Sequence, residues 1–517
     1  MCSLSIIRFQ RLALIVMVLL AGCLPAQQKP SSDDSSGGPI SGGRLVMTLD
    51  VKDISTLDPV VPSDNSAIWT ILNLYDQLFR VSRDAQSVES DAVKRYDLSA
   101  DGVTYSFFLR EGLTFSDGTP VVMDDVIFSV QRMFASEHWG WLFPKDAIVE
   151  PLDEHTFQIR LKQPNAALIN NLAGFWSSIV PRKQVETLGE AFWEKPISSG
   201  PFRVKEWVRG SHIVLERNPY YWGEPAYLDE VELSLVTDDN IRMLKFQAEE
   251  LDVATNVPFN QVAALDALDG VSVQTAPLLS VDFIIINASR PPLDDVNVRL
   301  ALNHATDKQA IIDVVLFGYG EDASLALPKM MFWDEQLEGY PFDIERARNY
   351  LQKSSVPDGF EITYSYRGDS IPDAQIGVLL QEQWRQIGIK LNLEPLEGAV
   401  VRQRMFDNDL DLAKAFNSSD VIDPSQLIAI YLCRITKPVM GLCHERIDQL
   451  YIESEMLMQT EEREAVYHEI MQLAHEWAVH IPIYHAPART AVWDRVHGFQ
   501  VLPTGNFRLW EVWIEQQ

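Results

Sequence analysis

Histidine and glutamate side chains lie next to each other near the C-terminus, the pairing that zinc peptidases use for hydrolysis. His475-Glu476 is followed by His480, but the H-E-x-x-H motif needs its second histidine four residues after the first, one helical turn away. His468-Glu469 fails the same test. The chain contains no G-x-S-x-G, G-x-x-x-x-G-K, G-x-G-x-x-G or C-x-x-C motif either. The sequence therefore predicts no catalytic residue, no metal site and no cofactor. Paired carboxylates need no motif, so an exported hydrolase or peptidase stays as the alternative.

The N-terminus has the order of a secretory signal: two arginines, an apolar run over residues 12–20, then small residues before Cys23. The run is shorter than the roughly 20 residues that span a bilayer, so a retained membrane anchor is the weaker alternative. Leu20-Ala21-Gly22-Cys23 resembles the lipobox of bacterial lipoproteins. The resemblance implies that residues 1–22 are a signal peptide and that an acylated Cys23 tethers the mature chain to a membrane. Ordinary cleavage nearby, with a free Cys23, is the alternative.

Composition divides the rest of the chain into a stalk and a body. Residues 23–43 are rich in Pro, Ser, Gly and Asp, which predicts a flexible stalk. The roughly 475 residues that follow are enough for two or three domains. Removal of residues 1–22 deletes two arginines and no acid, so the mature charge is 41 minus 73, or −32. Such a chain repels polyphosphates, and nucleic acid is not expected as a partner.

Two cysteines lie close together in the body, Cys433 and Cys443. An isolated close pair in an exported protein most simply forms a disulfide, which would contribute roughly 3 kcal/mol in the loop-entropy model. A metal site that includes His444 is the alternative, but it lacks a fourth ligand at the usual spacing. The sequence therefore favours the disulfide.

Hydrophobic spacing along the body alternates between the periods of strands and helices. Residues 105–109 and 156–161 are typical of strands, and the apolar run 283–287 is typical of a strand buried on both faces. Helical spacing covers residues 124–134, 296–315, 374–387 and 460–480. This alternation predicts an α/β protein.

Several short segments follow one another in a recognisable order. The most specific block is Leu109–Pro120, followed by Asp125-Val126 and Phe128-Ser129. The other segments are Thr56–Pro59, Leu74–Leu78, Asp101–Phe107, Ser199–Phe202, Asn218–Gly223, residues 287–302 and Ile481–Ile483. This ordered set, from near residue 44 to near residue 500, resembles family 5 of extracytoplasmic solute-binding proteins, the group that contains oligopeptide- and dipeptide-binding proteins.

The resemblance implies an α/β periplasmic-binding-protein type II fold, in which hinge strands join two lobes and an extra domain is inserted in the first lobe. Residues 283–287 would cross between the lobes and residues 482–486 return. A ligand held between the lobes is buried when they close, which turns binding into a shape that a transporter can recognise. The implied division is lobe I at 44–75, 198–283 and 486–517, the inserted domain at 76–197, and lobe II at 284–485.

The same resemblance implies a binding protein without catalysis. It would be a monomeric, lipid-anchored receptor on the periplasmic or cell-surface face of a bacterial membrane, which captures short peptides or a peptide-like solute for the permease of an ABC importer. Within the same fold, a nickel chelate, haem, an opine or an oligosaccharide is the alternative cargo. A sensor or adhesion lipoprotein is a further alternative, and the sequence has no signalling module.

The stretch Asp411–Pro424 matches the segment that holds the ligand in peptide-binding relatives. There, a basic residue is followed by a glycine-tryptophan pair and then by an aspartate that binds the ammonium group of the peptide. Residue-by-residue matching places Lys414 at the basic position and Asp420 at the aspartate. Exposed backbone from Asn417 to Ser419 can bond a peptide main chain as an added strand does.

Two features of this stretch leave the ligand open. Phe416-Asn417 stands where glycine-tryptophan is expected, which crowds the ligand backbone and removes a large apolar wall. Lys414 either receives a ligand carboxylate or lays its stem along apolar surface near a sheet edge, because lysine lacks the bidentate geometry of arginine. By the same resemblance, Ser63 to Asn65 lines the opposite lobe. The predicted ligand-binding residues are Asp420, Lys414, Asn417, Ser418, Ser419, Ser63 and Asn65.

Trp139-Gly140-Trp141 adds aromatic surface in the predicted inserted domain. The two indoles form either a platform for a ligand side chain or sugar, or part of a core or interdomain contact. Packing is the commoner use of such residues.

Overall fold

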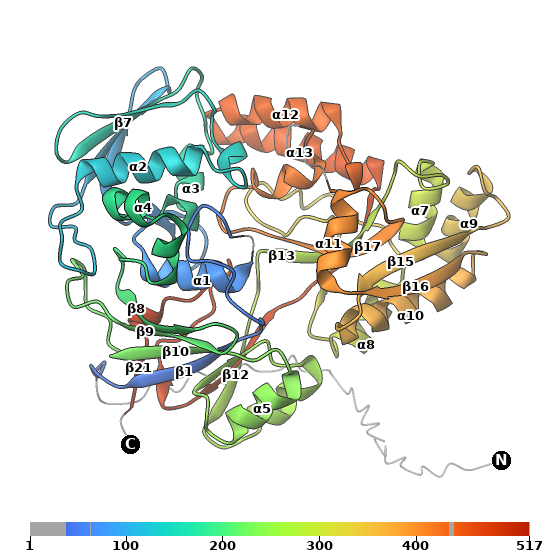
Figure 1. The fold of residues 1–517 in the computed structure, drawn as a ribbon. Coiled ribbons are helices and arrows are strands. Elements are labelled where there is room, and N and C mark those ends of the chain that lie inside the picture. The colour runs from blue at the N-terminus through green and yellow to red at the C-terminus, as the bar shows by residue number, and fades with distance from the viewer. Residues whose placement is uncertain (1–37, 63, 434–438, 516–517) are drawn as a thin grey trace, which may run out of the picture. The chain divides into compact units, whose positions relative to one another are not determined.

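The computed structural model of the protein describes residues 38–62, 64–433 and 439–515, and its strands form two large mixed sheets (Figure 1). Helices and strands together confirm the predicted α/β class. The seven-stranded sheet has the order β12 (Val271–Ala276), β19 (Ala488–Trp493), β11 (Val253–Thr255), β1 (Arg44–Leu49), β10 (Glu230–Leu235), β9 (His212–Arg217) and β8 (Phe202–Val208). The six-stranded sheet has the order β14 (Glu321–Asp322), β18 (His480–His485), β13 (Ser280–Ile286), β17 (Leu412–Ser418), β15 (Glu361–Arg367) and β16 (Lys390–Leu396).

The chain passes between the two large sheets at two places. β12 leads into β13 through residues 277–279, and β18 leads into β19 through Ala486 and Pro487. β13 pairs with β17 from its first residue, Ser280. The lobe boundary predicted between residues 283 and 284 therefore falls inside β13, and the passage lies a few residues earlier.

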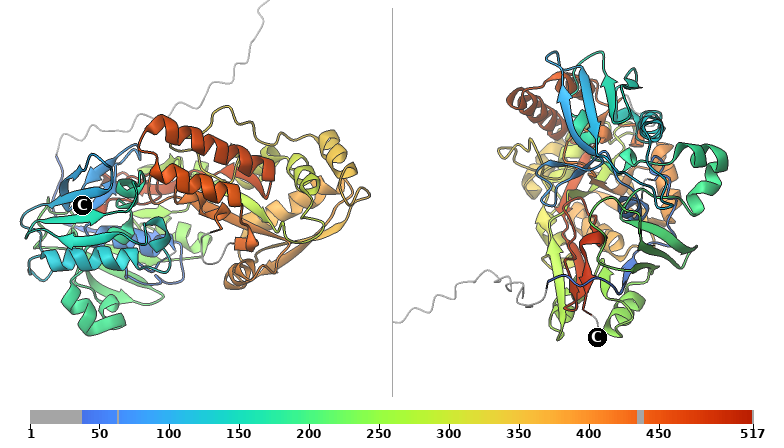
Figure 2. Two further views of the ribbon diagram at one scale, coloured as in Figure 1. Left: turned by 90° about the horizontal axis from the view of Figure 1, so that it is seen from above. Right: turned by 90° about the vertical axis from the view of Figure 1, so that its left-hand side faces the viewer.

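Strand β13 is buried on both faces, as its apolar run predicts. Val281, Phe283 and Ile285 belong to a core shared with α12 (Glu445–Met456) and α13 (Thr460–Trp477). Ile284 and Ile286 belong to the opposite core. That core also contains residues of α7 (Val296–His304), α8 (Lys308–Val315), α9 (Ile344–Gln352) and α10 (Ile371–Arg385). Helices thus cover both faces of the six-stranded sheet, and α12 and α13 lie side by side in all views (Figures 1 and 2).

The segment predicted as one helix over residues 296–315 is two helices, so that prediction is wrong in its length. α7 ends at His304, and Asp307 caps α8 by accepting a hydrogen bond from the N–H of Ala310 at 3.0 Å. A local carboxylate cap of this kind competes with continuation of the preceding helix. Among the described residues, no helix combines the length and the apolar content needed to cross a membrane.

The four-stranded sheet of the predicted inserted domain shares a core with the seven-stranded sheet. Trp139 packs against this core and stacks on Trp176 with 4.9 Å between ring centroids, and its indole N–H donates to the Pro62 carbonyl at 3.1 Å. Trp141 packs against this core and against the core of β13, α12 and α13. Both tryptophans are therefore used in packing. The sheet has the order β4 (Val93–Leu98), β5 (Thr104–Leu109), β7 (Thr156–Arg160) and β6 (Ile148–Pro151), and α2 (Met123–Phe134) packs on it.

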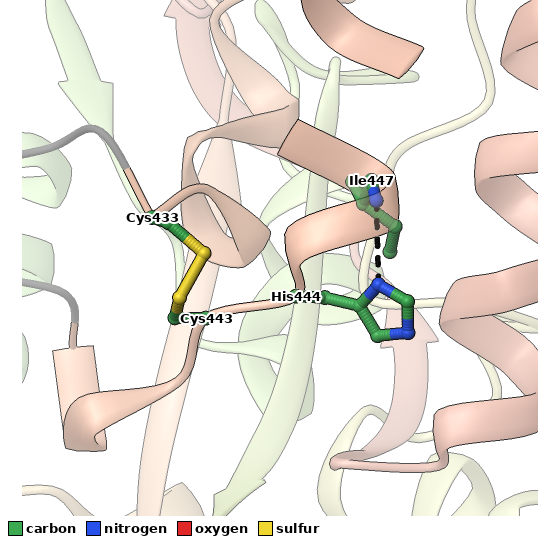
Figure 3. Close-up of a disulfide and its surroundings, with 4 residues drawn as sticks. All are labelled: Cys433, Cys443, His444 and Ile447. Atoms are coloured by element: carbon green, nitrogen blue, oxygen red, sulfur yellow. Dashed lines mark hydrogen bonds between the residues drawn. A yellow bond between two sulfur atoms is a disulfide. The ribbon is translucent and has the colours of Figure 1, made fainter. Parts of the chain in front are cut away.

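A disulfide joins Cys433 to Cys443 shortly before α12, as predicted (Figure 3). The next residue, His444, is the N-cap of α12, and its Nδ1 accepts the N–H of Ile447 at 3.3 Å. The two sulfurs are bonded to each other and the Nδ1 atom of His444 accepts a hydrogen bond. These interactions explain why the three residues lie together, and no metal is needed to explain it. The bond closes the loop that precedes two core helices.

Candidate ligand-binding site

Strand β17 carries three of the seven predicted ligand-binding residues, Lys414, Asn417 and Ser418, and lies in the interior of the six-stranded sheet. It pairs with β13 along its whole length, antiparallel, from Ser280–Ser418 to Ile286–Leu412. On its other side, β15 runs parallel to it but pairs only at Leu412 and Ala413. Beyond Ala413, β17 therefore has one paired side and one side without a partner strand in the described part of the chain.

The pairing with β13 determines which backbone groups of β17 face the open side. The N–H of Ser419 donates to the Leu279 carbonyl at 3.0 Å, which continues the register beyond the end of the strand. Because hydrogen-bonded residues alternate along an antiparallel pair, odd-numbered residues here bond β13 and even-numbered ones face away. Phe416 and Ser418 thus direct their N–H and C=O groups to the open side, whereas those of Asn417 face β13.

Lys414 forms an ion pair within the chain. Its ammonium contacts the carboxylate of Asp282 on β13 and donates to the Ala415 carbonyl at 3.1 Å. Its side chain is only 8% exposed. Burial raises the pKa of Asp373 at the start of α10, and the charge of Lys414 opposes that rise. The positive charge of Lys414 is thus already shared by carboxylates of this chain.

Phe416 and Asn417 occupy the two faces of the strand. Phe416 is 63% exposed, so its ring is not used in the core. Asn417 points to the opposite face, where its amide donates to the Leu427 carbonyl at 3.1 Å. Asn417 therefore secures the segment after β17, and Phe416 supplies an open aromatic surface beside the free backbone.

Asp420 is a partly buried carboxylate just after β17. Its own N–H donates to Gln426 Oε1 at 2.9 Å, and Gln426 Nε2 donates to its carboxylate at 2.8 Å. Burial raises the pKa of Asp420 to about 6, and the Gln426 hydrogen bond opposes this rise. Among the described residues, Asp420 forms no ion pair. A carboxylate in this setting is suited to accept a cation from outside the chain.

Asp423, three residues further on, has the opposite environment. It is fully buried and forms a bidentate pair with Arg463 of α13, at 2.6 and 2.9 Å. Burial acts to raise its pKa, but the charge and hydrogen bonds of Arg463 hold the pKa below its ordinary value. Asp423 is thus a structural anion that is satisfied inside the protein, and Asp420 is not.

The turn after Asp420 also contacts the predicted inserted domain. Asn170 donates to the Asp423 carboxylate at 3.1 Å, and the Ser425 hydroxyl lies 3.1 Å from Asn171 Oδ1. Val421 belongs to the core of the seven-stranded sheet. The segment that carries Asp420 is therefore held from two sides.

The remaining candidates lie elsewhere or outside the described residues. Asn65 is the exposed first residue of α1 (Asn65–Leu74), and no hydrogen bond or ion pair among the described residues joins it to β17. Ser63 and Cys23 lie outside the described residues. His480 is buried in β18, edge-on to Phe283, and burial lowers its pKa to about 3.

Residues that sequence reasoning missed include Asp282, Gln426, Arg463 and Arg367. Asp282 is 132 residues from its partner Lys414, and no local pattern connects them. Arg367 is the last residue of β15, two residues beyond the point where β15 stops pairing with β17, and its exposed side chain contacts Asp369 at 3.3 Å. Only its place at a strand end, next to the matched segment, could have indicated it.

The two sheets joined by two passages are those of a type II periplasmic binding protein, which confirms the predicted fold. The solved structure of the dipeptide binding protein from Pseudoalteromonas sp. SM9913, in complex with Met-Leu, has a TM-score of 0.83. It covers 92% of this chain and 100% of that chain at 23% identity. At this identity the likeness establishes the fold alone.

Sequence comparison then identifies the family. Residues 87–434 match the bacterial extracellular solute-binding proteins, family 5 middle, and the chain belongs to this family, as its motifs predict. The probable D,D-dipeptide-binding periplasmic protein of Escherichia coli (strain K12) is 27% identical over 469 residues, 87% of this chain and 90% of that protein. Heme-binding protein A of Haemophilus influenzae is 27% identical over 465 residues, 84% of this chain and 85% of that protein. Both relatives are named as binding proteins and not as enzymes.

The buried pair predicts a strong effect of one substitution on stability. Arg463→Met keeps the apolar stem but leaves the Asp423 carboxylate buried without its cation, so the free energy of unfolding should fall by about 3–5 kcal/mol. Urea unfolding at pH 7 measures the change. Arg446→Met is the matched control, because Arg446 pairs with Glu469 at the surface of neighbouring helices and such pairs contribute about 0–1 kcal/mol. Equal losses in the two variants would contradict the structural role of Asp423.

Proposed function

We propose that the protein is a receptor that captures short peptides, or a peptide-like solute with a free ammonium group, and delivers them to the permease of an ABC importer. The observation that carries this proposal is Asp420, a partly buried carboxylate with no cation partner among the described residues, beside an open strand side. A ligand ammonium would supply the missing charge. The dipeptide names of relatives from Escherichia coli and Pseudomonas aeruginosa support the same class of cargo.

The geometry of β17 suggests how a peptide would lie. With its ammonium at Asp420, the peptide main chain would bond the open N–H and C=O groups of Ser418 and Phe416, as an added strand does. It would then extend toward the end of β15, where Arg367 is exposed. Lys414 is buried and paired with Asp282, whereas Arg367 pairs with Asp369 at 3.3 Å only at the exposed surface, so Arg367 is the better candidate for a ligand carboxylate.

The exposed ring of Phe416 bears on the nature of the cargo. A bulky side chain next to the open backbone narrows the space for a ligand side chain and offers an aromatic wall instead. A flat or partly apolar solute with an ammonium group would suit this wall as well as a peptide would. Native mass spectrometry of protein purified from its host would identify retained cargo, and a haem, metal-chelate or sugar mass would overturn the peptide proposal.

Delivery requires the receptor to stay near its importer. We propose that residues 1–22 are removed on export, that acylated Cys23 holds the protein at the periplasmic or cell-surface face of a membrane, and that it acts as a monomer. The stalk would let the body reach the permease while the anchor confines it.

Substitution of the ammonium site should weaken peptide binding strongly. Asp420→Ala leaves a buried ligand ammonium without its partner, so affinity for free-amine dipeptides should fall about 10²–10⁴-fold. Isothermal calorimetry at pH 7.5 measures the change, with N-acetylated dipeptides as ligand controls and Asp407→Ala, an exposed acid on the same lobe, as the protein control. Unchanged affinity in Asp420→Ala would remove Asp420 from the site.

Substitution at the strand end should have a smaller effect. By the register of β15 and β17, Arg367 is level with Ala415, five residues from Asp420, so a peptide of about four or five residues is needed to reach both. Arg367 is exposed, so Arg367→Ala should weaken the binding of such a peptide with a free carboxylate by about 1 kcal/mol, roughly fivefold. The same substitution should leave the binding of the C-terminally amidated peptide unchanged. Equal losses for both ligands would show that Arg367 does not bind the carboxylate.

The lipid anchor can be tested in cells. The full chain expressed in a bacterium should incorporate labelled palmitate and fractionate with membranes, whereas Cys23→Ser should do neither. Export is measured separately, by the shift of the precursor to the shorter mature chain on a gel. Membrane association of unlabelled wild-type protein would contradict the anchor and leave a retained hydrophobic segment as the alternative.

A further inference from the structure

We propose that Gln426 is a positioning residue of the ammonium site, whose side-chain amide orients the Asp420 carboxylate and keeps it ionised while leaving its charge for the ligand. This inference rests on the proposed function and deepens it. Gln426 was not indicated by the sequence, and its place follows from the hydrogen bonds of the turn after β17.

Gln426 grips Asp420 at two points. Its Oε1 accepts the N–H of Asp420 at 2.9 Å, and its Nε2 donates to one carboxylate oxygen, Oδ2, at 2.8 Å. The Ser419 hydroxyl lies 3.2 Å from the same Oε1, which adds a contact on the acceptor side. One planar amide thus fixes both the backbone and the side chain of Asp420. No described residue donates a hydrogen bond to the other carboxylate oxygen, Oδ1, which is the atom we assign to the ligand ammonium.

Gln426 is itself held rigidly. Its side chain is largely buried, and it lies between Asp423 and Ser425 on one side and a short helical turn that begins at Leu427 on the other. Its neighbour Ser425 contacts Asn171, and Asp423 is clamped by Arg463. A side chain with fixed rotamers is what a preorganised binding group needs from its support.

The chemical type of the support matters as much as its position. A lysine or arginine in the place of Gln426 would pair with Asp420 and compete with a ligand ammonium. A neutral amide donor stabilises the carboxylate against burial but adds no charge. Two cations of the described residues that contact the same segment are paired with other carboxylates, Lys414 with Asp282 and Arg463 with Asp423. Among the described residues, burial and the Gln426 hydrogen bond are the two causes that act on the pKa of Asp420.

Two variants separate the functions of the amide. Gln426→Met has a similar volume and removes both hydrogen bonds. Gln426→Glu keeps an acceptor for the Asp420 N–H but replaces the donor with a like charge. In both variants the ionised form of Asp420 loses its stabilising donor, so its pKa should rise above about 6. Gln403→Met is the matched control, because Gln403 donates to the Asp407 carboxylate at 2.8 Å in an exposed position far along the chain from Asp420.

The pKa can be measured without a ligand. Carbon-13 NMR of protein labelled at the aspartate carboxyl carbons gives the titration of Asp420, whose signal is identified by its loss in Asp420→Asn. We expect a midpoint near 6 in the wild type and in Gln403→Met, and a higher midpoint in both Gln426 variants. An unmoved midpoint in both Gln426 variants would overturn the inference. Gln426→Glu is close to isosteric, so it decides the matter if Gln426→Met fails to fold.

Binding gives a second readout that a merely structural residue would not move. If the midpoint rises from about 6 to about 8, the ionised fraction at pH 7 falls from about nine-tenths to about one-tenth. Calorimetry with free-amine dipeptides should then show a wild-type to variant affinity ratio of roughly nine at pH 7 that falls toward one near pH 9, where deprotonation of the ligand amine weakens binding to both proteins alike. A loss that is equal at both pH values would overturn the inference. Absence of dipeptide binding by the wild type would instead overturn the proposed function, and the NMR titration would still decide how Gln426 acts on Asp420.

Discussion

The antiparallel pairing of β13 with β17 is the constraint on which the candidate site depends. Its register brings the Lys414 ammonium to the Asp282 carboxylate. It also directs the backbone N–H and C=O groups of Phe416 and Ser418 to the side where β15 no longer pairs with β17. A slip of one residue would exchange the two faces of β17 and move Lys414 from Asp282 into a core. The Lys414–Asp282 pair opposes such a slip, and the five apolar side chains of β13 are already packed in two separate cores. The packing of β13 therefore determines which backbone groups of β17 face its unpaired side.

Two aspartates three residues apart illustrate how environment assigns different roles to one residue type. Asp423 meets a guanidinium in a bidentate pair, and its pKa is lowered despite burial. Within the part of the chain that the structure describes, the Asp420 carboxylate is bonded by a neutral amide and by no cation, and burial raises its pKa to about 6. The first arrangement uses the charge to fix the turn against α13 and Asn170. The second leaves a partly buried charge without a cation among the described residues. On the proposed function, a ligand ammonium would gain more from this carboxylate than from one in water, and stability of the turn and affinity for the ligand would be supplied by separate groups.

Much of the fold could be predicted because its determinants are local or repetitive. The run at β13, the helices near residues 124–134 and 460–480, and the close cysteine pair each have a signal within a short window of sequence. Ordered motifs gave the family and the fold. The break between α7 and α8 was missed because the cap at Asp307 outweighs a hydrophobic period that continues through it. The chain crosses between the sheets at residues 277–279, a few residues before the predicted boundary. The start of β13 could not be predicted locally because it depends on pairing with β17, which lies more than a hundred residues away.

The candidate site was predicted only in part for a related reason. The resemblance to relatives predicted Asp420 and Lys414, which stay predictions, but it could not indicate Asp282 or Gln426, whose contacts exist only after the sheet and the turn have formed. Recognition of an ammonium group and a main chain does not depend on ligand side chains, so these elements can be kept while the cargo changes. Selection between ligands would then depend on the side chains that line the site. Phe416 is such a side chain, and it stands where the resemblance predicts a different residue. A family whose relatives are named for dipeptides and for heme is consistent with this division. The open aromatic face of Phe416, more than the carboxylate of Asp420, is therefore where the specificity of this receptor should be sought.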